Sequence, residues 1–257
     1  MNNSEAVFLG LPKEFQNKFL IYPPTVKEVV GNPNFFQYKT LLTLSQEELE
    51  DIFIKNNKEK GFDSYDQFKV PTPFEYLMAN SYHNKEVEQI AKDAFYFFTR
   101  QQITFLYEQG IILIGDLEEE IERVGKNINA LVFLKPEEFL DFQNAIRECL
   151  GEDKVEPPDP TLHPRIRRMK ALARYRDKIK AKKGMGINLL TTLVSICCMG
   201  IGITPLNIGE LSYASLSTIV RTYQEKEKYE IDIRSLQAGA DAKKIKPKYW
   251  IRNLENN

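Results

Sequence analysis

The apolar residues of this chain recur mostly with the period of an α-helix. Leu49, Ile52 and Phe53 are spaced i, i+3 and i+4, which places them on one side of a helix. The same periodicity predicts helices over residues 86–98 and 139–150, each with one apolar face. The chain is therefore expected to be mainly helical.

Capping residues predict where three of the helices begin. Thr25 is followed three residues later by Glu28, which is the spacing of a capping box. Ser45 precedes two glutamates that would lie near the positive end of a helix dipole. Thr72 precedes Pro73, a residue that suits the first position of a helix. These local signals fix three helix starts without any tertiary information.

Two short runs rich in β-branched residues interrupt the helical pattern. Residues 103–107 and 111–114 are separated by three residues that end in Gly110. Glycine takes the positive φ that short hairpin loops require, so a small β-hairpin is predicted near residues 103–114. The polar residues 55–66 are predicted to form a loop.

The clearest break along the chain is the sequence Glu-Pro-Pro-Asp-Pro at residues 156–160. Three prolines exclude both a helix interior and a central strand. We therefore predict an α+β N-terminal domain at residues 1–155, a Pro-rich linker at 156–162 and an all-α C-terminal domain at 163–257. The predicted fold class is mainly α with a small β-hairpin.

Positive charge is concentrated in one segment, residues 163–183. The whole chain has a net charge of −1, but this segment has ten Lys and Arg residues against one acid, Asp177. It could contact nucleic acid by neutralising phosphates, dock on an acidic protein, or form a solvated helix. Tyr175 is its one aromatic residue that could stack on a base, which disfavours the first possibility. The acidic run at 118–122 is an evident intramolecular partner.

The most apolar stretch, residues 184–207, follows directly. A basic segment ahead of an apolar run is compatible with a membrane anchor at residues 187–206, but this run is at the short limit for spanning a bilayer. We favour a central helix of a helical domain, apolar on most sides because other helices cover it. Cys197 and Cys198 would then be unreactive core residues. A tight turn at 200–205 is expected to follow.

Catalytic chemistry has little support in the sequence. His83 and His163 are the only histidines, and neither has the spacing of a metal site. The sequence has no GxSxG nucleophile motif, no GxxxxGK[ST] phosphate-binding motif and no GxGxxG dinucleotide-binding motif after a strand. We expect a non-enzymatic protein with no catalytic residue, cofactor or metal. Three cysteines without a pairing pattern, and no visible secretory signal, favour the cytosol.

The C-terminal end places the single tryptophan in a basic tail. Tyr249, Trp250 and Arg252 together have the composition of a protein-interface hot spot. The alternative is that this tail is a strap that buries Trp250 against the body of the protein.

The run from Leu193 to Ile219, with Gly-Ile-Thr-Pro-Leu at 202–206, resembles the C-terminal pattern of tail assembly chaperones of tailed phages. The segment 159–251 is similar to proteins of the tail or baseplate modules of contractile-tailed phages and prophages of Gram-positive bacteria. The shared features are a charged helix, an apolar helix and turn, an aromatic and charged helix at 222–226, and a terminal tryptophan.

This resemblance implies a role in phage tail or baseplate morphogenesis, as an assembly chaperone or minor virion component, in the host cytoplasm or the virion. The implied partners are phage tail or baseplate proteins, tape-measure and tube subunits among them. The candidate partner-binding residues are basic or aromatic: Arg165, Arg167, Arg168, Arg174, Arg176, Tyr223, Tyr249, Trp250 and Arg252. The alternatives are a nucleic-acid-binding phage protein that uses residues 165–183 and a membrane-anchored protein.

Overall fold

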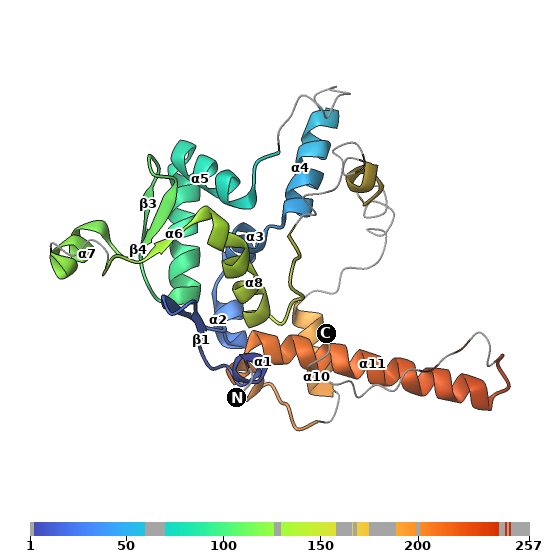
Figure 1. The fold of residues 1–257 in the computed structure, drawn as a ribbon. Helices are drawn as coiled ribbons and strands as arrows, with labels where there is room; N and C mark the ends of the chain where they lie inside the picture. The colour runs from blue at the N-terminus through green and yellow to red at the C-terminus, as the bar shows by residue number, and fades with distance from the viewer. Residues whose placement is uncertain are drawn as a thin grey trace.

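A computed structural model describes residues 3–59, 70–125, 130–157, 166, 169–174, 189–198, 201–241, 245 and 247 (Figure 1). Its helices are α1 (Asn3–Phe8), α2 (Val26–Gly31), α3 (Phe35–Thr43), α4 (Gln46–Glu59), α5 (Pro73–His83), α6 (Lys85–Thr99), α7 (Leu117–Val124), α8 (Phe139–Cys149), α10 (Leu189–Cys198) and α11 (Tyr213–Gln237). Two short 3-10 helices are η3 (Pro136–Glu138) and η4 (Ile208–Glu210). The predicted fold class, mainly α with little sheet, is confirmed.

The helix starts predicted from capping residues are present. Thr25 and Thr72 each form a complete capping box with the glutamate three residues later. The hydroxyl of Ser45 accepts a hydrogen bond from the Glu48 N–H at 3.2 Å, at the start of α4. α4 runs on to Glu59, so the loop predicted from residue 55 is wrong over its first five residues. Polar helix-forming residues extend a helix into solvent once its first turns are anchored.

The described strands form two antiparallel sheets. The predicted hairpin is confirmed: β3 (Ile103–Leu106) pairs with β4 (Ile111–Ile114), and β5 (Phe133–Leu134) joins the outer side of β4. A second hairpin, β1 (Lys13–Phe15) with β2 (Phe19–Ile21), was not predicted. Each of its strands is only three residues long, which is too short to show a period-2 pattern.

The main core is aromatic and lies between α6, α8 and the β1–β2 hairpin. The rings of Phe95 and Phe142 are stacked with centroids 5.0 Å apart, and Phe15 meets Phe142 edge-on at 5.8 Å. Burying one such ring contributes about 1.5–3 kcal/mol. α8 is therefore the helix on which the N-terminal elements converge.

The C-terminal elements pack directly on the N-terminal part of the chain. Thr25 and Ser212 form an antiparallel bridge, the Val26 N–H donates to the Leu211 carbonyl at 2.9 Å, and the Tyr213 N–H donates to the Pro24 carbonyl at 2.8 Å. A second hydrophobic cluster forms beside this bridge, from Val26, Ile196, Ile208 and Leu216. The domain boundary predicted at 156–162 stays a prediction, and elements from both sides of it share this contact.

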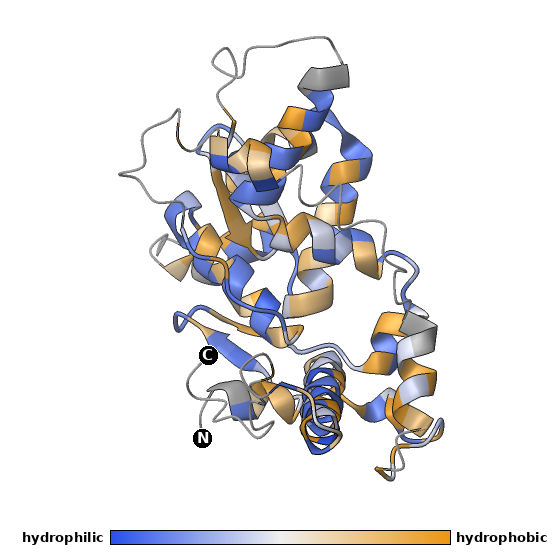
Figure 2. Ribbon diagram, turned by 90° about the vertical axis from the view of Figure 1, so that its right-hand side faces the viewer, coloured by the Kyte–Doolittle hydropathy of each residue, from blue (hydrophilic) through white to orange (hydrophobic). Residues whose placement is uncertain are grey.

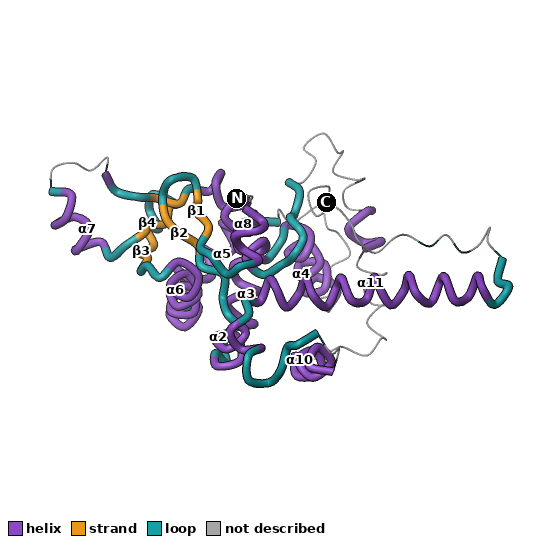
Figure 3. Tube along the Cα trace, turned by 90° about the horizontal axis from the view of Figure 1, so that it is seen from below, coloured by secondary structure: helices purple, strands orange, loops and turns teal. Residues whose placement is uncertain are grey.

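Helix α11 projects from the body of the molecule, at the end opposite to α7 (Figures 1 and 3). Its buried residues are confined to its first turns, and none after Leu216 is buried. The helix continues to Gln237. Ion pairs one turn apart, from Glu230 to Lys226 and to Arg234, support this exposed continuation.

Gly151 lies just after the end of α8, where the chain packs closely against α11. An added side chain there should destabilise the fold. The φ of Gly151 is +68°, and an added Cβ would lie 3.0 Å from both the Ala214 carbonyl oxygen and the Ser217 Cβ. We expect Gly151→Ala to lower the free energy of unfolding by about 2–4 kcal/mol, the sum of backbone strain and overlap. Urea denaturation measures the change.

Gly110→Ala is the matched control, because Gly110 has a φ of +65° but nothing within 4 Å of the added Cβ. Gly110→Ala should lower the free energy of unfolding by only about 1–2 kcal/mol, through backbone strain alone. An equal loss in both variants would contradict close packing at Gly151.

The ion pair between Lys18 and Glu138 should make stability depend on pH. The Lys18 ammonium lies 2.6 Å from the Glu138 carboxylate and also donates to the Phe133 carbonyl at 2.9 Å. Partial burial would raise the pKa of Glu138, but Lys18 and the Lys135 N–H outweigh it and hold the pKa below 4.5. The stabilisation that this ion pair gives to the folded protein is therefore complete above pH 4.5. It is lost as the pH falls through the lowered pKa of Glu138.

Glu138→Gln should lower the free energy of unfolding by about 1–2 kcal/mol at neutral pH. It should also remove the loss of stability in acid that comes from this ion pair. Thermal unfolding of both proteins from about pH 7 to about pH 3 tests this, since the difference between them should shrink towards the acid end. A constant difference would show that the pair does not shift the Glu138 pKa.

Candidate protein-binding surface

Helix α10 buries one side and exposes the other. Ile196 is fully buried in the second hydrophobic cluster, and Leu193 and Cys197 pack against that cluster. On the opposite side, Val194 is 55 % exposed and Cys198 is also exposed. The prediction that other helices cover α10 on most sides is therefore wrong. Within the described part of the chain, the cluster that α10 packs into comes from α11, η4 and the start of α2.

The turn that follows α10 also exposes apolar side chains. Ile201 is 49 % exposed and Leu206 is 94 % exposed. The four exposed residues Val194, Cys198, Ile201 and Leu206 are called the apolar turn patch below. Figure 2 shows α10 as largely hydrophobic, next to a mainly hydrophilic α11 seen end-on.

The turn that presents Leu206 is held by hydrogen bonds. The Asn207 carboxamide oxygen accepts from the Thr204 N–H at 2.7 Å, and its amide nitrogen donates to the Gly202 carbonyl at 3.2 Å. The Ile208 N–H donates to the Thr204 carbonyl at 3.0 Å. Leu206 is thus fixed in an exposed position by its neighbours. A rigidly presented, exposed apolar side chain is typical of a binding surface.

The cysteines do not behave alike. Cys198 is exposed, so the expectation that both adjacent cysteines belong to the core is wrong for this residue, and Cys197 is half-buried. Cys149, on α8, is buried, and burial raises the pKa of its thiol to about 12. Cys149 is therefore a packing residue with little thiolate at neutral pH.

Arg174 from the basic segment binds the acidic face of α4. Its guanidinium lies 2.6 Å from the Glu47 carboxylate and 3.0 Å from the Glu50 carboxylate. Glu50 is only 3 % exposed, and Ala171, one turn before Arg174, is fully buried. None of the ion pairs that the described part of this segment forms involves the acidic run at 118–122, which was the predicted partner. In α7, Glu120 instead binds Arg123 of its own helix.

The remaining candidate residues are only partly within the described structure. Tyr223 lies on the projecting part of α11 and is partly exposed. The others lie outside the described residues: Arg165, Arg167, Arg168, Arg176, Tyr249, Trp250 and Arg252. The binding roles of all of these residues stay predictions.

The described ranges contain neither a candidate metal site nor a candidate membrane span. No group of three His, Cys, Asp or Glu residues in them could hold a metal ion. No helix in the same ranges is both long enough and apolar enough to cross a lipid bilayer, α10 having ten residues.

Residues 179–255 match a sequence family described as the YomV second domain, a phage-type domain known from a Bacillus prophage. The match covers less than a third of the chain and includes α10, η4 and α11, but none of α1–α8. No curated protein and no solved structure is significantly similar to the chain. The phage association of the predicted resemblance is confirmed, and the apolar turn patch lies inside the phage-type region.

The attachment of the basic segment to α4 can be tested at Arg174. Arg174→Met removes the guanidinium from Glu50, a buried carboxylate, and should lower the free energy of unfolding by about 1–3 kcal/mol. Arg221→Met is the control, since Arg221 binds Asp153 at 3.4 Å with both side chains largely exposed, and it should cost less than about 1 kcal/mol. Equal losses in urea denaturation would contradict a buried attachment.

Proposed function

We propose that this chain is a non-enzymatic phage protein that binds another phage protein through the apolar turn patch and α11, during tail or baseplate assembly. The observation that supports this most directly is Leu206, 94 % exposed on a hydrogen-bonded turn inside the region similar to the YomV second domain. A turn that is rigid before binding loses little conformational entropy when a partner covers it.

The size of this surface suits reversible binding. Burial of one exposed leucine or isoleucine contributes about 1.5–3 kcal/mol, and a few such residues amount to a modest affinity once the cost of association is subtracted. The projecting part of α11 adds a long charged surface beside the patch, with Tyr223 and the 61 % exposed Ile231 on it. Apolar anchors rimmed by charge are the usual composition of transient protein interfaces.

An assembly chaperone would use such a surface to cover apolar faces of tape-measure or tail-tube subunits before they assemble. Proteins are favoured over nucleic acid because Arg174, the described arginine of the basic segment, already binds two carboxylates of α4. Its charge is therefore largely neutralised within the chain. Phosphate binding depends on free positive charge on the protein, which neutralises phosphates and releases the cations condensed on the nucleic acid.

The test is co-expression of the tagged full-length protein with the tail and baseplate proteins of its own phage, followed by affinity purification. We expect a tail or baseplate subunit to co-purify, and Leu206→Asp to reduce its recovery about tenfold, as the loss of about 1.4 kcal/mol implies. Tyr96→Asp is the control, because Tyr96 is 53 % exposed on α6, and it should leave recovery unchanged.

Three results would overturn the proposal. They are co-purification of nucleic acid alone, removed by nuclease or by salt; a tail subunit bound equally well by the Leu206→Asp protein; and no tail or baseplate subunit recovered at all. Circular dichroism of each variant establishes that the fold is retained.

A further inference from the structure

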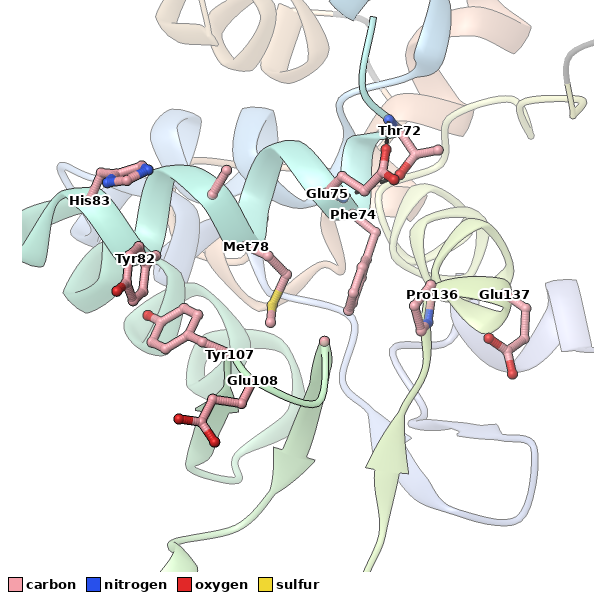
Figure 4. A pocket seen from close by; sticks show the side chains of 12 residues that line it. Thr72, Phe74, Glu75, Met78, Tyr82, His83, Tyr107, Glu108, Pro136 and Glu137 are labelled. Carbon is pink, nitrogen blue, oxygen red and sulfur yellow. Dashed lines mark hydrogen bonds between the residues drawn. The ribbon is translucent and has the colours of Figure 1, made fainter. Parts of the chain in front are cut away.

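A second surface lies far along the chain from the phage-type region. α5, the turn between β3 and β4, and η3 enclose a groove of about 940 Å³ (Figure 4). Phe74 and Met78 of α5 form its apolar floor, and both are almost completely buried. A groove of this volume accommodates several side chains of a bound segment.

The wall of the groove is aromatic and rigid. The rings of Tyr82 and Tyr107 meet edge to face with centroids 5.2 Å apart, and Tyr107 in turn stacks on Phe105 at 5.5 Å. Burial, with the nearby charge of Glu88, raises the pKa of Tyr107 to about 12, so this ring is neutral at physiological pH. Tyr82 is 63 % exposed although it belongs to this aromatic array. An exposed tyrosine held by a half-buried one is a preorganised contact for an apolar ligand group.

The rim of the groove is negatively charged. Glu75, Glu108 and Glu137 line it from α5, the β3–β4 turn and η3 respectively, and all three are exposed. None of them forms an ion pair with a lysine or arginine in the described part of the chain, whereas the neighbouring Glu138 pairs with Lys18. The basic residue among the lining is His83, at the end of α5. Unneutralised carboxylates around an apolar floor select a ligand with positive charge beside its apolar groups.

We propose that this groove binds a short segment of a partner protein in which aromatic or aliphatic side chains are flanked by lysine or arginine. The apolar side chains fill the space over Phe74 and Met78, a ring or aliphatic chain packs on Tyr82, and the basic side chains face Glu108 and Glu137. This site is separate from the apolar turn patch and does not depend on the function proposed for that patch.

The experiment uses the full-length protein and a library of random twelve-residue peptides displayed on a carrier. Peptides are selected on the wild-type protein after depletion on the Tyr82→Ala protein. We expect the retained peptides to combine apolar residues with lysine or arginine. A labelled retained peptide is then titrated by fluorescence anisotropy.

Binding of that peptide should weaken at least about tenfold with Tyr82→Ala and with the double charge reversal Glu108→Lys, Glu137→Lys. Tyr96→Ala and Glu119→Lys are matched controls, since both positions are exposed and lie outside the groove, and they should change Kd less than about twofold. Leu206→Asp should leave Kd unchanged, which separates this site from the one above.

Several results would overturn the proposal. One is that no peptide survives depletion on the Tyr82→Ala protein; another is that the retained peptides are acidic or uncharged. Sedimentation velocity addresses a third: concentration-dependent self-association that Tyr82→Ala abolishes would make a second copy of this chain the occupant.

Discussion

The described C-terminal helices α10 and α11 meet the N-terminal part of the chain around one short stretch of backbone pairing, between residues 24–26 and 211–213. Two helices, α2 and α11, begin on either side of it, and their N-caps Thr25 and Ser212 are the bridged residues. At a helix start the first amide groups lack partners within the helix. Here the Val26 and Tyr213 amides donate across the bridge instead. Each hydrogen bond therefore satisfies one amide at a helix start and also joins the two parts of the molecule.

Local features of this fold could be predicted from the sequence because local interactions determine them. The capping boxes at Thr25 and Thr72, and the hairpin around Gly110, need only residues within a few positions. The helix α3 and the β1–β2 hairpin were missed. The hairpin turn uses positive φ at Gln16 and Asn17 without a glycine, and its short strands are stabilised by packing on Phe142 of α8, which no local pattern reveals.

The candidate surfaces were harder to predict because exposure is a tertiary property. The sequence identified residues 184–207 as apolar, but the exposure of Val194 and Cys198 depends on which side of α10 the first turns of α11 occupy. The partner of Arg174 could not be chosen from the sequence for a similar reason. Two acidic runs were available, and only the folded chain places α4, with Glu47 and Glu50, beside the basic segment.

The attachment of α11 also has a mechanical consequence. The helix is roughly 37 Å long, from 25 residues at 1.5 Å each, and its buried residues all lie near its start. There, the hydroxyls of Ser212 and Ser215 donate to the Phe8 carbonyl of α1. A force applied at Gln237 therefore acts with a long lever arm on the contacts around Ser212, the hydrogen bonds to α1 among them. A partner that pulls on this part of α11 would strain the backbone pairing at residues 24–26 and the hydrogen bonds to α1 together.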